Sequence, residues 1–442
     1  MARNERKPRI AALAQRQPAA PQANRKETVA IGLKPTSKHN RLKIAALLAI
    51  FVVVIVAAML VRQYQLFQFH TMAQSARAVQ DWDRVATVTH LWLDRDPDSP
   101  AANLFAAEAA QHRGSFEQAA ELYSRITATD PAAAHAKTQQ ALLYLGPLNR
   151  PALGEAALEQ AIRINPQSIE AQRELLRHYG ITAQRAKAFA QAREAVKNGS
   201  DSPATYIYLI SFDSIVFSNG KDTNARWLQS GTNNERFEVA MLINAARAAG
   251  LGESSDALVD TSQRRAELAQ QESTLLTALE KYPENLELLA ILLNTYSDRG
   301  DVERVTQLLS QVPATAANDA RFFRYKGWLH WMRDEFAAAE EAFRQAIAKD
   351  PYDWKSQTQL AETLRLQHRT SEAEIALNSA SIGTQLRKSI LGLSTIETIP
   401  IDVLEQLHRY ATTMGDEVVA KRLVIRMDQI RDSATAITSN AE

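Results

Sequence analysis

The hydrophobic and polar positions divide the chain into three parts. Residues 44–61 read IAALLAIFVVVIVAAMLV without a charge, residues 1–43 are mostly polar and basic, and residues 62–442 place apolar residues at helical spacing. At ~1.5 Å per residue, a helix over the apolar run would span roughly 27 Å, close to the ~30 Å hydrocarbon core of a bilayer. The pattern predicts a transmembrane helix at 44–61.

The flanks of this run favour an uncleaved signal anchor. Lys43 and Arg62 bracket it, and Tyr64 and Phe67 follow it, as expected for charges at the headgroups and aromatic rings at the interface. A cleaved signal peptide is the first alternative, but its apolar stretch is usually ~7–15 residues and close to the N-terminus. A buried core helix is the second alternative.

Charge is distributed unevenly about the predicted span. Residues 1–43 carry a net charge of +9, which leaves −8 for the rest because the whole chain carries +1. Positive residues next to a span are retained on the cytoplasmic side. We therefore expect a cytoplasmic tail, a span in a bacterial inner membrane and a periplasmic C-terminal part.

The tail has too little apolar surface to fold alone, so we expect it to be disordered. A second interpretation is that the tail cations nearest the span take part in binding. Each would contribute about 1 kcal/mol of attraction to an anionic leaflet. They would bind anionic lipid or a cytoplasmic partner. These residues are Lys34, Lys38, Arg41 and Lys43.

Composition favours helices in the large C-terminal part. The chain has only 15 Gly and 15 Pro in 442 residues and is rich in Ala, Leu, Glu, Gln and Arg, which are good helix formers. It has no cysteine, which excludes disulfides, thiolate metal sites and a cysteine nucleophile.

Prolines recur at a regular interval. Pro97, Pro131 and Pro166 are 34 and then 35 residues apart, and Pro283 and Pro351 are 68 apart, twice 34. A period of this length indicates a repeated helix-turn-helix unit, and a proline at its end stops the second helix.

The residues between the prolines follow a packing rule. Before Pro131, Gly114 is placed to form a turn, and Phe116, Ala119 and Tyr123 follow at helical spacing. Before Pro351, the equivalent residues are Phe336, Ala339, Phe343 and Ala346, with Gly327 in the preceding helix. Small residues allow helices to approach closely, and large ones fill the remaining space.

This pattern closely resembles the tetratricopeptide repeat (TPR) family. The resemblance is strong at 100–133 and 320–353 and weaker at 69–99, 135–168 and 354–382. It implies an all-α fold: a right-handed α-solenoid of antiparallel helix pairs, here preceded by one transmembrane helix. The first helix of each pair would line a concave groove.

Between the better repeats, the period fails where turn-rich clusters flank Trp227, and YIYLISF at 206–212 fits either a short helix or a strand. This part is either a hinge or a degenerate repeat with a long loop. After the tail and span we expect a TPR-like block at 62–200, an irregular interruption or hinge at 201–235, a second block at 236–382, a looser connection at 383–399, a C-terminal helix pair at 400–432 and a tail at 433–442.

No catalytic motif is present. The nine histidines are scattered, and the sequence has no His-Glu-x-x-His pair, phosphate-binding glycine loop or Gly-x-Ser-x-Gly elbow. We expect no enzyme activity, no cofactor and no metal. Nucleic-acid binding is disfavoured because the basic charge lies in the tail beside the membrane.

The TPR register predicts one binding surface. In the repeat at 320–353 it directs four side chains of the first helix toward the groove, with one lysine from the next repeat nearby, giving a cationic, aromatic patch for an acidic or C-terminal peptide segment. These residues are Arg321, Arg324, Trp328, Trp331 and Lys355. The alternative is that the tryptophans fill the core and the arginines are solvated. Replacing both arginines with alanine is expected to abolish partner capture without changing thermal stability.

Three functions remain open. The first is a membrane-anchored scaffold that binds other proteins in the periplasm, in envelope assembly, secretion or polysaccharide export. The second is a chaperone-like or translocon-associated factor for exported polypeptides, and the third is an organelle import receptor with cytosolic repeats. Ala45 and Ala49 form a small-xxx-small pair, a weak signal for a homo-oligomer.

Overall fold

The computed structural model describes residues 38–231, 234–251, 262–393 and 399–439. Within these ranges, every regular element is a helix. In chain order they are α1 (Lys38–Ala78), α2 (Trp82–Leu93), α3 (Pro100–His112), α4 (Phe116–Ser124), α5 (Ala133–Leu145), α6 (Pro151–Ile164), α7 (Ile169–Ile181), α8 (Arg185–Asn198), α9 (Pro203–Ser211), the 3-10 helix η1 (Phe212–Ser214), α10 (Gly220–Leu228), α11 (Asn234–Ala248), α12 (Ser262–Lys281), α13 (Leu286–Asp298), α14 (Val302–Ser310), the 3-10 helix η2 (Ala314–Asn318), α15 (Ala320–Met332), α16 (Phe336–Lys349), α17 (Trp354–Leu366), α18 (Thr370–Leu391), α19 (Ile401–Thr413) and α20 (Glu417–Ser439).

The chain separates into two units, residues 1–65 and 66–442. In the first unit, the apolar side chains of α1 are exposed. The stretch Ala45–Ala78 is long and apolar enough to cross a membrane, and none of its most apolar window, of mean hydropathy 2.8, is buried against protein. A continuous exposed apolar surface of this kind is unusual in water and is typical of a membrane span.

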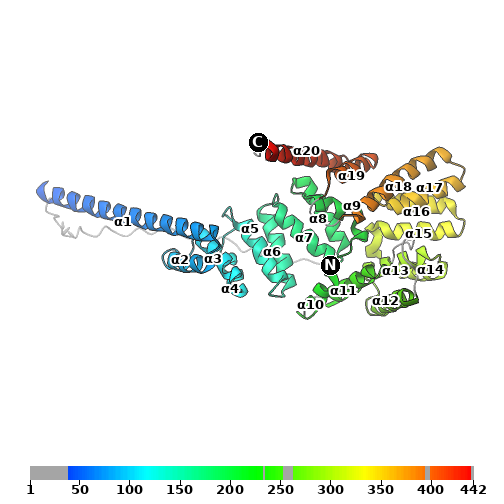
Figure 1. Cartoon of the computed structure of the whole chain (residues 1–442), viewed down its shortest axis with the longest axis horizontal. Coiled ribbons are helices and arrows are strands. Elements are labelled where there is room, and N and C mark those ends of the chain that lie inside the picture. The colour runs from blue at the N-terminus through cyan, green and yellow to red at the C-terminus, as the bar shows by residue number, and fades with distance from the viewer. Residues whose placement is uncertain (1–37, 232–233, 252–261, 394–398, 440–442) are drawn as a thin grey trace, which may run out of the picture. The chain divides into compact units, whose positions relative to one another are not determined.

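In the second unit, the helices form antiparallel pairs whose turns share one backbone feature (Figure 1). A residue with positive φ joins the two helices of a pair, and it is glycine at Gly114 and Gly300, where φ is 77° and 76°. Four other residues take the same position with φ of 50–61°, namely Asn149, Ala183, Asp334 and His368. Gly300, Asp334 and His368 follow one another at intervals of 34 residues. The backbone therefore keeps the 34-residue repeat even where the glycine is replaced by another residue.

The first helices of successive pairs also contact one another. α5 packs on α7, α7 on α9, α11 on α13, α13 on α15, and α15 on α17. This places one row of helices along an inner face and their partners behind it, the arrangement of an α-solenoid. The prediction of an all-α, TPR-like array with one apolar helix before it is confirmed.

The packing rule is seen most clearly in α15 and α16. A Cβ added to Gly327 would lie 2.6 Å from Cδ1 of Phe343, and the Phe343 side chain is fully buried. Ala339 and Ala346, one turn away on either side, are buried too. The missing side chain therefore lets the two helices approach closely enough to enclose the ring.

The stretch 201–235 packs onto the repeats around it. The YIYLISF segment forms α9 and runs into η1, and its residues are almost all buried. The indole N–H of Trp227 on α10 donates to the carbonyl of Leu145 at 3.0 Å. These contacts anchor the stretch to α5.

The C-terminal pair packs against a much earlier part of the chain. Side chains of α18, α19 and α20 share one hydrophobic core with those of α6 to α9. Asp201, which is fully buried, forms ion pairs with Arg422 and Arg426 of α20. Accordingly, α20 lies beside α8 in Figure 1.

Candidate functional site

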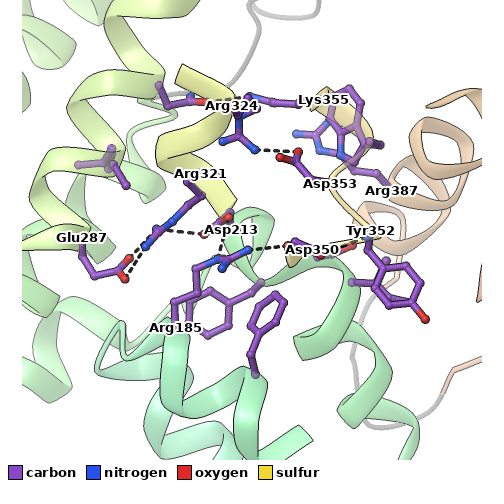
Figure 2. Close-up of a pocket in the computed structure, with 18 of the residues that line it drawn as sticks. Arg185, Asp213, Glu287, Arg321, Arg324, Asp350, Tyr352, Asp353, Lys355 and Arg387 are labelled. Carbon is purple, nitrogen blue, oxygen red and sulfur yellow. Dashed lines mark hydrogen bonds and ion pairs between the residues drawn. The ribbon is translucent and has the colours of Figure 1, made fainter. Parts of the chain in front are cut away.

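A cavity of about 120 Å³ opens where α8, which precedes the stretch 201–235, meets helices that follow that stretch. We call it the junction pocket. Its walls come from α8, α9, η1, α11, α13, α15, the turn before α17, α17 and α18, and Figure 2 labels most of its charged side chains. Six basic and four acidic residues line it: Arg185, Arg247, Arg321, Arg324, Lys355, Arg387, Asp213, Glu287, Asp350 and Asp353.

The inner helices of the second block supply one wall. On α13 the lining positions are Glu287, Ala290, Ile291 and Asn294, a spacing that places them on one face of the helix. The next inner helix, α15, contributes Arg321 and, one helical turn later, Arg324 and Tyr325. The pocket therefore lies on the side of the array that its inner helices face.

Three arginines from different helices converge on Asp213 of η1. Nε of Arg185 on α8 lies 3.2 Å from its Oδ2. Arg247 on α11 and Arg321 on α15 each lie 3.7 Å from Oδ1. The arginines hold the pKa of Asp213 below its ordinary value, although burial alone would raise it. The carboxylate is therefore ionised.

Arg321 is the most firmly held cation of the pocket. Its Nη1 and Nη2 donate to the two carboxylate oxygens of Glu287, both at 2.8 Å, and Nη2 also donates to Asp319 at 2.7 Å. Burial lowers the pKa of Arg321, but these acids and Asp213 more than offset it, so the pKa is well above the usual value. Bidentate pairs of this kind fix the guanidinium in one orientation.

Arg324 links α15 to the next repeat. Its Nη1 donates to Oδ1 of Asp353 at 2.7 Å, and its Nη2 donates to the hydroxyl of Tyr325 at 3.1 Å. Asp353 in turn caps the N-terminus of α17 through the backbone N–H of Ser356. The arginine is therefore part of the structure that positions α17.

The far end of the pocket combines cations with an aromatic ring. The guanidinium of Arg387 lies 5.9 Å from the ring centre of Trp354, and Nζ of Lys355 lies 6.0 Å from it. Lys355 donates to Oδ1 of Asn294 at 2.8 Å, and its nearest ion-pair partner, Asp298, is 3.9 Å away. This end offers apolar surface and hydrogen-bond donors together.

Two cations of the pocket have incomplete charge compensation. Burial lowers the pKa of Lys355, with Asp298 opposing and Arg324 adding to the effect. Burial also lowers the pKa of Arg247, in spite of Asp213 and Glu287. Since a buried cation is stabilised by a nearby anion, a negatively charged group close to Lys355 and Arg247 would stabilise both.

The structure places three of the five predicted groove residues in the pocket. Arg321, Arg324 and Lys355 line it. Trp328 is buried in the core formed with α13 and α14, and Trp331 packs against the core between α16 and α17. The tryptophans are therefore in the core, whereas the arginines are ion-paired inside the pocket instead of being solvated.

Of the predicted tail residues, Lys34 lies outside the described residues. Lys38 and Arg41 belong to the first turns of α1, and Lys43 is exposed. Their proposed contact with lipid or a cytoplasmic partner stays a prediction.

The sequence reading missed Arg185, Asp213 and Arg247. Each lies outside the best repeats, and Asp213 belongs to the stretch where the period fails. Single charged residues carry no periodic signal, so only the fold brings them together. Within the described ranges, no group of three or more His, Asp or Glu residues could hold a metal ion. What the pocket can do chemically is hold an anion.

No family model matches the chain, and no curated protein matches it. Among solved structures, the chain is similar to one from the crystal structure of the APC/C hetero-tetramer Cut9–Hcn1. The two are 13% identical, the match covers 81% of this chain and 71% of the other, and the TM-score is 0.30.

Proposed function

We propose that this protein is a membrane-anchored scaffold that binds an extended segment of another protein in the junction pocket. One observation carries the proposal: six basic side chains line a cavity that the inner helices of a TPR-like array help to form. Concave surfaces of helical repeats bind extended segments, and arginine recognises carboxylates through paired hydrogen bonds. Binding, not catalysis, is the chemistry these residues support.

The exposed apolar stretch of α1 supports attachment to a membrane. The charge difference between residues 1–43 and the rest supports a cytoplasmic tail and repeats on the opposite side. We therefore propose a bacterial inner membrane, a periplasmic array and a role in envelope assembly, secretion or polysaccharide export.

Crosslinking in cells tests the binding site. A photoreactive residue replaces Ile291, which lines the pocket, and a matched variant carries it at Glu341, on the exposed side of α16. The scaffold predicts a discrete adduct from position 291 and none from position 341. Many adducts of different sizes from position 291 would favour the chaperone-like alternative. Equal crosslinking from both positions would contradict a pocket-bound partner.

A substitution in the pocket tests its charge. Lys355→Met removes a cation whose side chain is 30% exposed and which caps no helix. The expected result is loss of the adduct from position 291 with an unchanged melting temperature. The matched control is Lys421→Met on α20, whose side chain is 77% exposed and does not line the pocket. Retention of the adduct in Lys355→Met would argue against the site.

Topology is tested separately. A reporter active only outside the cytoplasm is fused after Glu442, with and without neutral replacement of the four tail cations Lys34, Lys38, Arg41 and Lys43. Activity of the unmodified fusion is expected. If neutral replacement of the four cations changes only the orientation of the protein, the tail acts as a topology signal. If the orientation is kept and a partner is lost, the result supports binding by the tail.

A further inference from the structure

Asp213 differs from the other acids of the junction pocket in how it is held. Its side chain is 41% exposed, whereas those of Asp350 and Asp353 are 10% and 6% exposed. It lies on η1, a turn of three residues, whereas Glu287 belongs to an inner helix and Asp353 caps one. Asp213 is therefore the acid most accessible from the cavity.

Its contacts are also the longest in the cluster. Arg185, Arg247 and Arg321 lie 3.2, 3.7 and 3.7 Å from its carboxylate. The corresponding distances are 2.8 Å from Arg321 to Glu287 and 2.7 Å from Arg324 to Asp353. Since ion pairs weaken with distance and exposure to water, removing Asp213 from the cluster costs less than removing either of the others.

Building on the proposed function, we propose that Asp213 occupies the place of a partner's carboxylate, which displaces it from Arg185, Arg247 and Arg321 when the partner segment binds. The incoming group is an acidic side chain or a chain terminus. The pocket is thus a carboxylate site that the chain fills with its own residue in the absence of a partner.

The exchange is consistent with the charges and space available. One carboxylate replaces another, so the three arginines keep a counterion throughout, which avoids leaving buried charges unpaired. The cavity of about 120 Å³ is several times the ~10–15 Å³ that a cavity needs to hold one water molecule, enough to admit a carboxylate with part of its side chain. Val216, just after η1, lines the cavity and is 51% exposed, so the segment beside Asp213 is not tightly packed on the cavity side.

Asp213→Asn tests the exchange by removing the internal charge at nearly constant shape. The full chain in detergent is titrated by calorimetry with three short peptides of the same length: one with a central Glu and blocked ends, one with Gln in its place and blocked ends, and the Gln peptide with a free C-terminal carboxylate. The expected result is a roughly five- to tenfold gain in affinity for a carboxylate peptide, as for two groups competing for one site, and no gain for the blocked Gln peptide. The Glu and free-terminus peptides distinguish the two sources of carboxylate. Unchanged or weaker binding of both in Asp213→Asn, including no binding to either form, would overturn the proposal.

A second measurement uses the unmodified protein and does not depend on the variant folding. Amide hydrogen exchange of Phe212–Ser214 is expected to accelerate when the preferred carboxylate peptide is added and to stay constant with the blocked Gln peptide. Unchanged exchange at saturation would overturn the displacement. If the peptides leave the exchange of Phe212–Ser214 unchanged but the crosslinked adduct from position 291 is still formed, only the proposed displacement of Asp213 is wrong. If position 291 gives no adduct, the proposed function itself is wrong.

Discussion

Nη2 of Arg185, on α8, donates to Oδ2 of Asp350 at 2.8 Å, although the two residues are 165 positions apart in the chain. Both side chains are largely buried. Burial raises the pKa of Asp350, with Arg185 opposing the effect. This ion pair joins the first block of repeats to the turn between α16 and α17, beside the junction pocket.

Replacing this arginine is expected to destabilise the protein strongly. Arg185→Met leaves Asp350 without its ion-pair partner, and breaking a buried pair on one side costs about 3–5 kcal/mol. Chemical denaturation of the full chain measures the free energy of unfolding. In the control Lys421→Met, an exposed pair with Glu417 is lost, which should leave the free energy of unfolding nearly unchanged because water screens such a pair. A similar small loss in Arg185→Met would show that the pair contributes little.

The buried arginines of α15 change an expectation drawn from the sequence. The side chain of Arg321 is only 4% exposed, and it neutralises Glu287 and Asp319. Arg321→Ala with Arg324→Ala should therefore lower the melting temperature as well as partner capture, because carboxylates lose their counterions. A differential scanning experiment on the full chain checks this. An unchanged melting temperature would restore the original expectation of a purely binding role.

The free energy of unfolding is expected to decrease as the pH is lowered, because of a buried histidine. His178 lies 3.3 Å from Glu155, which also pairs with Lys187 and Arg236. Burial lowers the pKa of His178 below its ordinary 6.5, and Arg236 and Lys187 add to this, while Glu155 opposes it. The unfolded chain then binds the proton more readily, so stability is present above 6.5 and decreases as the pH falls below it.

His178→Gln isolates this contribution. Urea denaturation above and below pH 6.5 should show a smaller loss of stability for the variant than for the unmodified chain. Identical pH dependences would mean that His178 takes up its proton equally well in the folded state.

Close packing of α15 on α16 predicts a steric defect. In Gly327→Ala the new Cβ meets the ring of Phe343 at 2.6 Å, and overpacking of this kind costs about 1–3 kcal/mol. Denaturation of Gly327→Ala, Phe343→Leu and the double variant forms a mutant cycle. We expect the double variant to be more stable than the sum of the single changes implies, because the smaller side chain makes room. Additive losses would indicate that the helices simply move apart.

Asp201 is expected to control the docking of α20. Asp201→Ala removes a buried acid that pairs with Arg422 and Arg426 and accepts from the hydroxyl of Tyr206 at 2.8 Å. The expected result is faster amide hydrogen exchange in residues 417–431, with α15 and α16 unaffected. Uniform acceleration along the array would contradict a local role.

The apolar face of α1 predicts dependence on the membrane. Val53→Arg with Val54→Arg places two charges within the span, each costing about 2.5–3.5 kcal/mol at its centre. The variant should be released by alkaline carbonate, whereas Val53→Leu with Val54→Leu should stay in the pellet. Retention of the arginine variant would argue against a transmembrane α1.

The repeats could be predicted because their signal is local and recurs. Phe336, Ala339 and Phe343 follow helical spacing, and the prolines mark the ends of the pairs, so the pairs were evident without tertiary information. The register also directed Arg321 and Arg324 to the inner face. The register did not distinguish these arginines, which line the pocket, from Trp328, which is buried in the core. A long side chain on the same helix can turn into the core between neighbouring pairs.

The other half of the junction pocket could not be predicted. Arg185, Asp213 and Arg247 each carry one charge in an unremarkable context, and no spacing rule connects position 185 with position 350. The C-terminal pair was expected near 400–432, but its packing on α8 and α9 depends on Asp201, Arg422 and Arg426 meeting in three dimensions. Such contacts depend on how the repeats stack on one another, which single repeats do not encode.

The ion pairs between Asp201 and α20 have a consequence for how the array unfolds. A repeat protein behaves as a linear chain of neighbours, in which the terminal unit frays first and a defect stays near where it arises. Here α20 is tied to Asp201, which lies between α8 and α9, so the contact between residues 201 and 426 closes a loop in the chain. Melting such a loop requires its closing contact to break together with its neighbours, and the array should lose this section in one cooperative step.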